Sequence, residues 1–402
     1  PEPAEITVLG PGDIAGELSL FEGGPRSATL RARSPVRLWV LAHTVFHALM
    51  EEQPALSRAM LAHLSSLVRR EGLNVAKLLS RRADPRYKVA FFDSKPYIEE
   101  AFRARNAERH AICYFEPRLS LETVALAAGF PVVCVFVNDC VNAAVVEQLH
   151  NLDVGMIALR CAGFNNVDLA ACRRCGISVT RVPAYSPYAV AEHAVALMLT
   201  LNRRLHRADG RTREGNFSLS GLVGFDMYRK TVGILGTGKI GKCAADILAG
   251  FGCRLLAYDK FPDRQLAEKL ALEYVGLDRL FAESDIITLH APLTPETRHL
   301  VGSDAINRMK NGVMLINTSR GALIDTRALL EGLKSRKIGY AGLDVYEEES
   351  AYFFEDFSDR VITDDLLARL TTFNNVIVTS HQAFLTREAL DAIAETTLEN
   401  IR

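Results

Sequence analysis

Three charged residues follow three short apolar runs in the second half of the chain. Arg320 comes after VMLIN, Glu349 after YAGLDV and His381 after NVIVTS. If these runs are parallel strands, the three side chains lie at the carboxyl edge of one sheet, where open α/β folds bind ligands. A guanidinium can grip a carboxylate through two hydrogen bonds, and a histidine that a carboxylate keeps protonated can give a proton to a carbonyl oxygen. These residues therefore predict a site that reduces a keto acid.

A glycine-rich turn earlier in the chain is a candidate nucleotide site. The run TVGILGTGKIGKCAADIL predicts a strand, then Gly236, Gly238 and Gly241 in G-x-G-x-x-G spacing, then a helix. Glycines there let the backbone approach a pyrophosphate at the helix N-terminus. The next predicted strand, RLLAYD, ends in Asp259, which can bind a ribose hydroxyl and favours NAD over NADP. The alternative interpretation is a glycine turn in an ordinary α/β domain.

Several separate motifs resemble the D-2-hydroxyacid dehydrogenase family. They run from Lys88 to the end of the chain: KVAFFDSKPY, RCAGFNNVDL, AYSPYAVAEHAVAL, LGTGKIG, LHAPLTPETRHL, NTSRGALIDT, LDVYEEE and SHQAF. The stretch YFFEDFSD, which follows DVYEEE, resembles the fermentative D-lactate dehydrogenase branch of that family. The resemblance implies an NAD-dependent enzyme that converts pyruvate and NADH to D-lactate and NAD. Another D-2-hydroxy acid stays open as the substrate.

The resemblance also implies roles for individual residues. Arg320 would clamp the substrate, His381 would donate the proton, and Glu349 would keep His381 charged and oriented. The cofactor-binding residues would be Gly236, Gly238, Lys239, Ile240, Gly241, Asp259, Ala291, Pro292, Thr297, Thr318, Ser319 and Asp344. The substrate-binding residues would be Ala162, Gly163, Tyr185 and Arg320, in a cleft between two domains.

Two further alternatives stay open. His290, His193 and His110 compete with His381 for the role of acid, although only His381 has an arginine and a glutamate in the register of the family. Some relatives of this fold act as NAD(H)-sensing corepressors, in which the dinucleotide sets an oligomer that binds other proteins. The complete set of catalytic residue types favours an enzyme.

The composition fits a soluble enzyme of two or three domains. In 402 residues, 47 basic and 48 acidic side chains nearly balance, which argues against a nucleic-acid partner. The longest apolar run, around AVALMLTL, is too short for a bilayer, and no signal peptide is visible. The eight cysteines are scattered, which favours a reducing cytoplasm, and the spacing of Cys172 and Cys175 predicts packing rather than a zinc site. We expect no metal and a homo-oligomer, either a dimer or a tetramer.

The first 85 residues predict a different kind of module. The run GDIAGELSLFEGGPRSATLRARSPVRLWVL alternates like short strands with glycine and proline breaks. It resembles the phosphate-binding cassette of cyclic-nucleotide-binding domains, which implies that Glu17 holds a ribose hydroxyl and Arg26 pairs with the cyclic phosphate. Gly16, Ser27 and Thr29 would shape the loop. Earlier strands of the β-roll have no counterpart in the sequence, so the alternative is a degenerate sensor that serves as a docking module.

The sequence therefore predicts an α/β chain with two Rossmann-like domains behind a partial β-roll. Residues 1–85 form the roll and the amphipathic helices that follow it. Residues 88–187 form the substrate domain, which a helix in 385–402, capped by Thr386, completes. Residues 188–384 form the NAD-binding domain. Its first helix, from about Tyr188 to Arg204, is apolar on nearly every side and is expected at a domain or subunit interface.

Overall fold

The computed structural model describes Ala32, Pro35, Val45 and residues 87–401. The chain separates into two units, Pro1–Pro85 and Arg86–Arg402. The β-roll, its helices and the nucleotide residues Gly16, Glu17, Arg26 and Ser27 lie outside the described residues. Within the part that is described, no helix is long and apolar enough to cross a membrane, and no cluster of His, Cys, Asp or Glu side chains could hold a metal ion.

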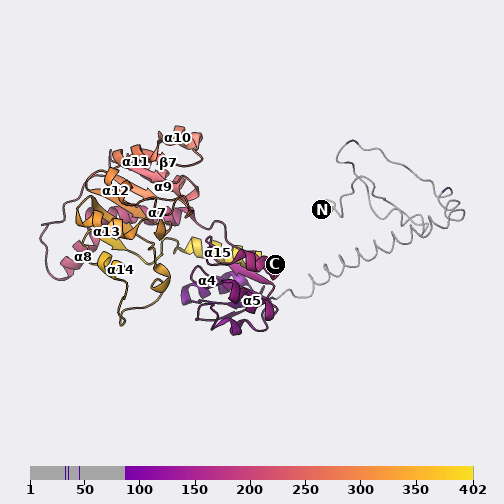
Figure 1. Cartoon of the computed structure of the whole chain (residues 1–402). Helices are drawn as coiled ribbons and strands as arrows, with labels where there is room; N and C mark the ends of the chain where they lie inside the picture. Colours follow the sequence, from indigo (N-terminus) through magenta and orange to yellow (C-terminus); the bar gives the residue numbers. More distant parts are fainter. Residues whose placement is uncertain (1–31, 33–34, 36–44, 46–86, 402) are drawn as a thin grey trace. The chain divides into compact units, whose positions relative to one another are not determined.

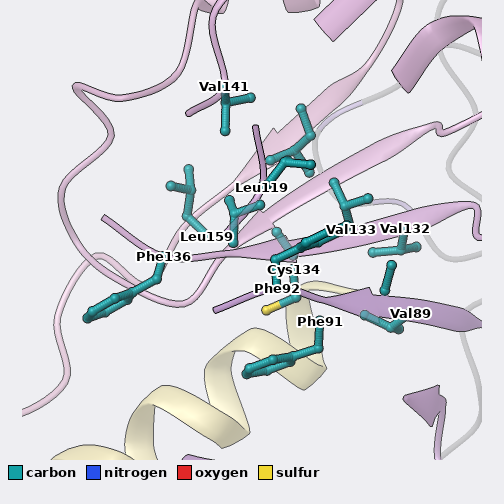
Figure 2. Close-up of a cluster of buried hydrophobic side chains, with 14 of the residues drawn as sticks. Val89, Phe91, Phe92, Leu119, Val132, Val133, Cys134, Phe136, Val141 and Leu159 are labelled. Carbon is teal, nitrogen blue, oxygen red and sulfur yellow. The ribbon is translucent and has the colours of Figure 1, made fainter. Parts of the chain in front are cut away.

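A five-stranded parallel sheet forms the first half of the described unit. Its strand order is β2-β1-β3-β4-β5. The strands are β1 (Lys88–Phe91), β2 (Ala111–Tyr114), β3 (Val132–Val135), β4 (Met156–Leu159) and β5 (Ser178–Thr180). Every residue of β3 is buried, as expected for a central strand that helices cover on both faces. Figure 2 shows the apolar side chains that gather around these strands.

Helices from both ends of the unit cover this sheet. They are α4 (Pro96–Asn106), α5 (Ala143–Asn151), α6 (Leu169–Arg174) and α15 (Arg387–Asn400), with the 3-10 turn η1 (Val124–Ala127). Thr386 caps α15 by accepting a hydrogen bond from the Ala389 N–H, and Leu398 is fully buried in the core of the sheet. The last helix therefore returns to the first sheet, beside α4 (Figure 1). We call these elements the five-stranded lobe.

A seven-stranded parallel sheet forms the other half, the seven-stranded lobe. Its strands are β6 (Thr231–Leu235), β7 (Arg254–Tyr258), β8 (Glu273–Tyr274), β9 (Ile286–Leu289), β10 (Val313–Asn317), β11 (Ile338–Leu343) and β12 (Val376–Val378). Their order is β12-β11-β10-β9-β6-β7-β8. The chain winds outward from β6 in one direction and from β9 in the other, so the strand order reverses between these two strands. Ligands of open α/β sheets bind at such a point. The predicted fold class, two parallel-sheet α/β domains, is confirmed.

Helices lie between the strands of this sheet. They are α7 (Pro187–Arg203), α8 (Leu205–Arg213), α9 (Lys239–Gly250), α10 (Arg264–Leu270), α11 (Leu277–Glu283), α12 (Ser303–Arg308), α13 (Thr326–Lys334) and α14 (Asp365–Thr371), with the 3-10 turns η2 (Gly321–Leu323) and η3 (Glu349–Ala351). Helix α7 packs on β10, β11 and β12 on one side and on α9 on the other. Its buried residues Ala194, Leu197, Met198 and Leu201 pack in the core of this lobe, and the interface between domains or subunits stays a prediction.

Candidate active site

Three neighbouring strands carry the candidate catalytic side chains. Strands β10, β11 and β12 lie next to one another and run parallel. Arg320 follows the end of β10, Glu349 that of β11 and His381 that of β12. The strand pairing therefore brings the three residues to one edge of the sheet, as the sequence predicted.

His381 and Glu349 form a direct pair at this edge. The Nδ1 atom of His381 lies 2.8 Å from Oε1 of Glu349, and both side chains are more than four-fifths buried. The other carboxylate oxygen of Glu349 accepts a hydrogen bond of 2.9 Å from the Tyr346 N–H. The Glu349 carboxylate accepts the hydrogen bond from Nδ1–H of His381. The Nε2 atom is therefore the ring nitrogen that can exchange a proton with a ligand.

Asp344 organises the loop on which His381 stands. Its fully buried carboxylate accepts hydrogen bonds from the Thr379 hydroxyl at 2.6 Å and from the N–H groups of Gln382 and Ala383 at 2.9 Å. The ring of His193 lies 3.4 Å away. Burial alone would raise the pKa of Asp344, but the hydrogen bonds from His193, Thr379 and Ala383 outweigh it and hold the pKa below its usual range. The Asp344 carboxylate is therefore ionised, and its oxygens are occupied by hydrogen bonds from this loop.

Arg320 contacts the loop that the sequence assigned to the substrate carboxylate. Gly163 lies so close that a Cβ atom there would stand only 2.8 Å from Nη2 of Arg320. Tyr185 lies in the same region: burial raises the pKa of its hydroxyl, and the Arg320 guanidinium partly opposes the rise. The Arg181 side chain fixes the backbone of Ala162 by donating a 2.7 Å hydrogen bond to its carbonyl oxygen. The four residues predicted to bind the substrate therefore lie together.

The glycine turn follows β6, at the reversal of strand order. Gly236 has a φ of 94°, which favours glycine, and a Cβ atom there would lie 2.7 Å from the His290 carbonyl oxygen. A Cβ atom on Gly241 would overlap the carbonyl oxygen of Gly236. Gly238 begins α9 without a side-chain cap, and no atom lies within 4 Å of where its Cβ would be. The N–H groups at the start of this helix can therefore bind a phosphate group closely.

A cavity of about 500 Å³ lies beside this turn. It is lined by Thr237, Gly238, Lys242, Asp259, Phe261, Pro262, Asp263, Arg264 and Gln265. Asp259 accepts hydrogen bonds from the Thr237 N–H at 2.6 Å and the Phe261 N–H at 2.8 Å. The Thr237 hydroxyl donates a third hydrogen bond of 3.1 Å to the same carboxylate. A carboxylate has about four acceptor sites, so Asp259 can still bind a hydroxyl group. Thr237 and Lys242 also line the cavity, and the sequence gave no signal for them.

The remaining cofactor candidates differ in what their side chains bind. The hydroxyl of Thr297 accepts from the Thr294 N–H and donates to the Pro292 carbonyl, so it closes its own turn next to Ala291. Ser319 donates a 2.7 Å hydrogen bond to the Leu289 carbonyl. The buried hydroxyl of Thr318, in contrast, has no hydrogen-bond partner among the described residues. A buried group of this kind fits a polar ligand.

The competing histidines have other surroundings. His290 is buried with its Nε2 atom 3.0 Å from the Thr288 hydroxyl, and burial lowers its pKa to about 4. It is therefore neutral at physiological pH and a poor proton donor. His193 binds Thr379 and Asp344, and His110 lies 3.3 Å from the Leu398 carbonyl in the other lobe. His381 is paired with Glu349 at the sheet edge that also bears Arg320, which are the surroundings expected of the acid.

A group of aromatic rings near His381 was missed by the sequence analysis. The Phe354 ring lies 5.9 Å from the His381 ring and 5.4 Å from Phe136, which in turn lies 5.8 Å from Phe384. Phe384 is 6.3 Å from Tyr185. Phe354 belongs to YFFEDFSD and Phe384 to SHQAF, so two motifs contained the rings, but no spacing rule said that they meet.

The comparisons with known proteins agree with this geometry. The family described as D-isomer specific 2-hydroxyacid dehydrogenase, NAD binding domain, matches residues 195–383. A protein of Escherichia coli named D-lactate dehydrogenase is 53% identical over 78% of this chain and 95% of its own length.

Solved structures agree as well. The apo structure of D-lactate dehydrogenase from Escherichia coli has a TM-score of 0.72 at 51% identity and covers 78% of this chain and 95% of its own. A structure titled as the pyruvate reductase of Chlamydomonas reinhardtii has a TM-score of 0.76 at 46% identity, with 79% and 96% covered. A second family, the cyclic nucleotide-binding domain, matches residues 2–53.

We predict that His290 causes the free energy of unfolding to decrease as the pH becomes acidic. Its folded pKa of about 4 lies below the ordinary value of 6.5, so the folded state resists protonation more than the unfolded state does. The contribution is complete above pH 6.5 and is lost as the pH falls toward 4, by up to about 3 kcal/mol. Urea unfolding at pH 7.5 and 5.0 should show a smaller loss for His290→Gln than for the parent. The exposed His150→Gln should match the parent, and equal losses in all three proteins would contradict the prediction.

Proposed function

The chain belongs to the D-isomer specific 2-hydroxyacid dehydrogenase family, and we propose that it reduces pyruvate to D-lactate. It is an NAD-dependent oxidoreductase, as its family is. The proposal for the substrate rests on the names of its relatives, a D-lactate dehydrogenase and a pyruvate reductase. The observation that carries the chemistry is the His381–Glu349 pair, 2.8 Å long, at the sheet edge that also bears Arg320.

In this proposal Arg320 binds the substrate carboxylate. Its planar guanidinium can donate two parallel hydrogen bonds, which a lysine cannot do. The contact between Arg320 and Gly163 supports the assignment, because the N–H groups of the Ala162–Gly163 loop can then bind the same carboxylate. The carboxylate would thus be held between the two lobes.

His381 then serves as the proton donor. Glu349 binds Nδ1 and stabilises the charged imidazole, so Nε2 carries the proton that moves to the substrate's carbonyl oxygen. The bound cofactor supplies the hydride that makes the carbonyl carbon tetrahedral. In the reverse direction neutral His381 accepts the hydroxyl proton, so the two directions need opposite protonation states of one residue.

We assign the cofactor to the glycine turn and the cavity beside it. The N–H groups of Lys239 and Ile240, at the start of α9, would bind the pyrophosphate, and Asp259 would bind the adenosine ribose. Ala291, Pro292 and Thr297 would line the adenosine side. The unpartnered hydroxyl of Thr318 supports a ligand near Ser319. A bond from Asp344 to the carboxamide remains a prediction, since its oxygens already serve the His381 loop.

The first test separates an enzyme from an NAD(H) sensor. NADH absorbance should fall when pyruvate is added to the protein, whereas tight NADH binding without turnover would favour the sensor.

Arg320→Lys should lower kcat/KM for pyruvate at least about tenfold, since a charged hydrogen bond is worth about 1.5–3 kcal/mol. NADH binding, followed by fluorescence, should stay near that of the parent. The exposed Arg327→Lys on α13 is the control, and a loss below twofold in Arg320→Lys would remove Arg320 from this role.

The second test addresses the glycine turn with two glycines of one helix. Gly241→Ala places a methyl group on the Gly236 carbonyl, so the turn must shift and NADH should bind at least about tenfold more weakly. Gly250→Ala meets no atom within 4 Å, and alanine favours a helix over glycine, so binding and stability should be kept. Isothermal titration calorimetry measures the NADH affinity of both variants, and urea unfolding measures their stability. Equal affinities would place the dinucleotide elsewhere.

We also propose that a cyclic nucleotide bound by residues 2–53 regulates the dehydrogenase. The match to the cyclic nucleotide-binding family supports this, with Glu17 for the ribose and Arg26 for the phosphate. Pyruvate reduction should change on adding cyclic AMP or cyclic GMP, and the change should vanish in Arg26→Gln but persist in Arg31→Gln. If titration calorimetry detects binding of neither nucleotide, the segment is a docking module instead. A dimer or tetramer and a cytoplasmic location also remain predictions.

A further inference from the structure

The segment between β11 and α14 belongs to the seven-stranded lobe and contacts the five-stranded lobe. We call residues 350–357 the strap. Arg118, which follows β2 in the five-stranded lobe, donates 3.0 Å hydrogen bonds to the carbonyl oxygens of Ser350 and Phe353. It also lies 3.0 Å from the carboxylate of Glu355. One guanidinium therefore fixes the strap at three points along its length, directly after Glu349.

Two adjacent phenylalanines of the strap hold it by apolar packing. Phe353 is 6% exposed and belongs to the core of the seven-stranded lobe. Phe354 is partly buried and packs against the cores of both lobes; Figure 2 shows Phe136 of the five-stranded lobe, its neighbour there. The strap is thus held from both sides, and the position of the Phe354 ring is determined by packing in addition to the Arg118 contacts.

The backbone of Phe354 is strained. Its φ is 67°, in the left-handed region that a bulky side chain rarely adopts. Such a conformation costs about 1–3 kcal/mol and persists where the surroundings enforce it, often at functional sites. Here the Arg118 bond to the Phe353 carbonyl fixes the preceding peptide, and the ring of Phe354 lies 5.9 Å from that of His381 and 5.4 Å from that of Phe136.

The ring stands where the substrate's remaining group must go. If Arg320 and Gly163 hold the carboxylate and His381 meets the carbonyl oxygen, the third group on the reacting carbon is the side chain. The Phe354 ring lies next to the His381 ring, and the rings of Phe136 and Phe384 continue from Phe354 in a row. They form an apolar wall and offer a side chain no hydrogen bond.

We propose that Phe354 determines substrate specificity by limiting the side chain of the 2-keto acid to one or two carbons. This inference rests on the proposed function and deepens it. The strap excludes large substrates and does not add binding energy. A short apolar side chain of the substrate fits beside the Phe354 ring, whereas a branched or aromatic side chain clashes with it. Because Arg118 and Phe353 hold the strap, the wall cannot easily retreat.

The test is a panel of 2-keto acids with NADH. For the parent, kcat/KM should fall in the order pyruvate, 2-ketobutyrate, 2-ketoisocaproate and phenylpyruvate. Phe354→Ala should raise the ratio of kcat/KM for 2-ketoisocaproate over pyruvate at least about tenfold, the size of effect expected when a pocket gains room for a methylene group or more. Phe357→Ala is the matched control. Its ring packs on Tyr352 within the same segment, 5.3 Å away, so the ratio should not change.

Two further variants keep the test decisive if Phe354→Ala folds poorly. Glycine accepts a φ of 67° without strain, and leucine keeps part of the bulk, so the ratio should rise from Phe through Leu to Gly at position 354. NADH fluorescence titration shows which variants are folded. An unchanged ratio in folded Phe354→Gly and Phe354→Leu would overturn the inference while leaving the proposed function intact. A parent that reduces none of the four acids would instead refute the proposed function.

Discussion

The buried carboxylate of Asp344 is the interaction on which the catalytic edge depends. A fully buried charge is costly unless donors surround it, and here Thr379, Gln382 and Ala383 supply them. The same residue accepts the N–H of His381 on its carbonyl oxygen at 2.7 Å. Asp344 follows β11, and the loop that carries His381 follows β12, so this one residue ties the ends of two strands together and fixes that loop. Removing the carboxylate would leave several buried donors without partners.

Glu349 has a support of its own, independent of Asp344. The Tyr346 N–H binds its carboxylate, and the Tyr346 hydroxyl donates a 2.7 Å hydrogen bond to Asp364, the residue that caps α14. On the other side Gly321, directly after Arg320, lies against the Tyr346 peptide so closely that a Cβ atom would overlap it. The loops that carry Arg320 and Glu349 are therefore packed backbone to backbone. The relative positions of the catalytic residues follow from main-chain contacts, which explains how three separate loops can hold one geometry.

The sequence predicted what depends on local pattern. Strand ends, the G-x-G-x-x-G turn and the Thr386 cap all follow from runs of a few residues, and parallel pairing then brings Arg320 and His381 to one edge. It did not predict Arg118 on the strap, because that contact joins residues 235 positions apart and uses carbonyl oxygens, which every residue has. Nor did it predict the left-handed backbone of Phe354, since a bulky residue adopts it only where tertiary contacts force it.

The two lobes contribute different parts of the recognition. In the proposed function the seven-stranded lobe carries the charged groups that act on the substrate, Arg320 and His381, at one sheet edge. The five-stranded lobe supplies Gly163 and Phe136, and through Arg118 it also holds the strap of the other lobe. If Phe354 limits the substrate's side chain as proposed, a change of substrate size would need only a change in the strap or its anchor, with His381 and Glu349 left in place. Because Glu349 begins the turn that leads into the strap, the wall and the acid also share one backbone. If the proposed roles of Phe354 and His381 hold, a displaced strap would move Glu349 relative to His381 and would couple the fit of the substrate's side chain to the orientation of the proton donor.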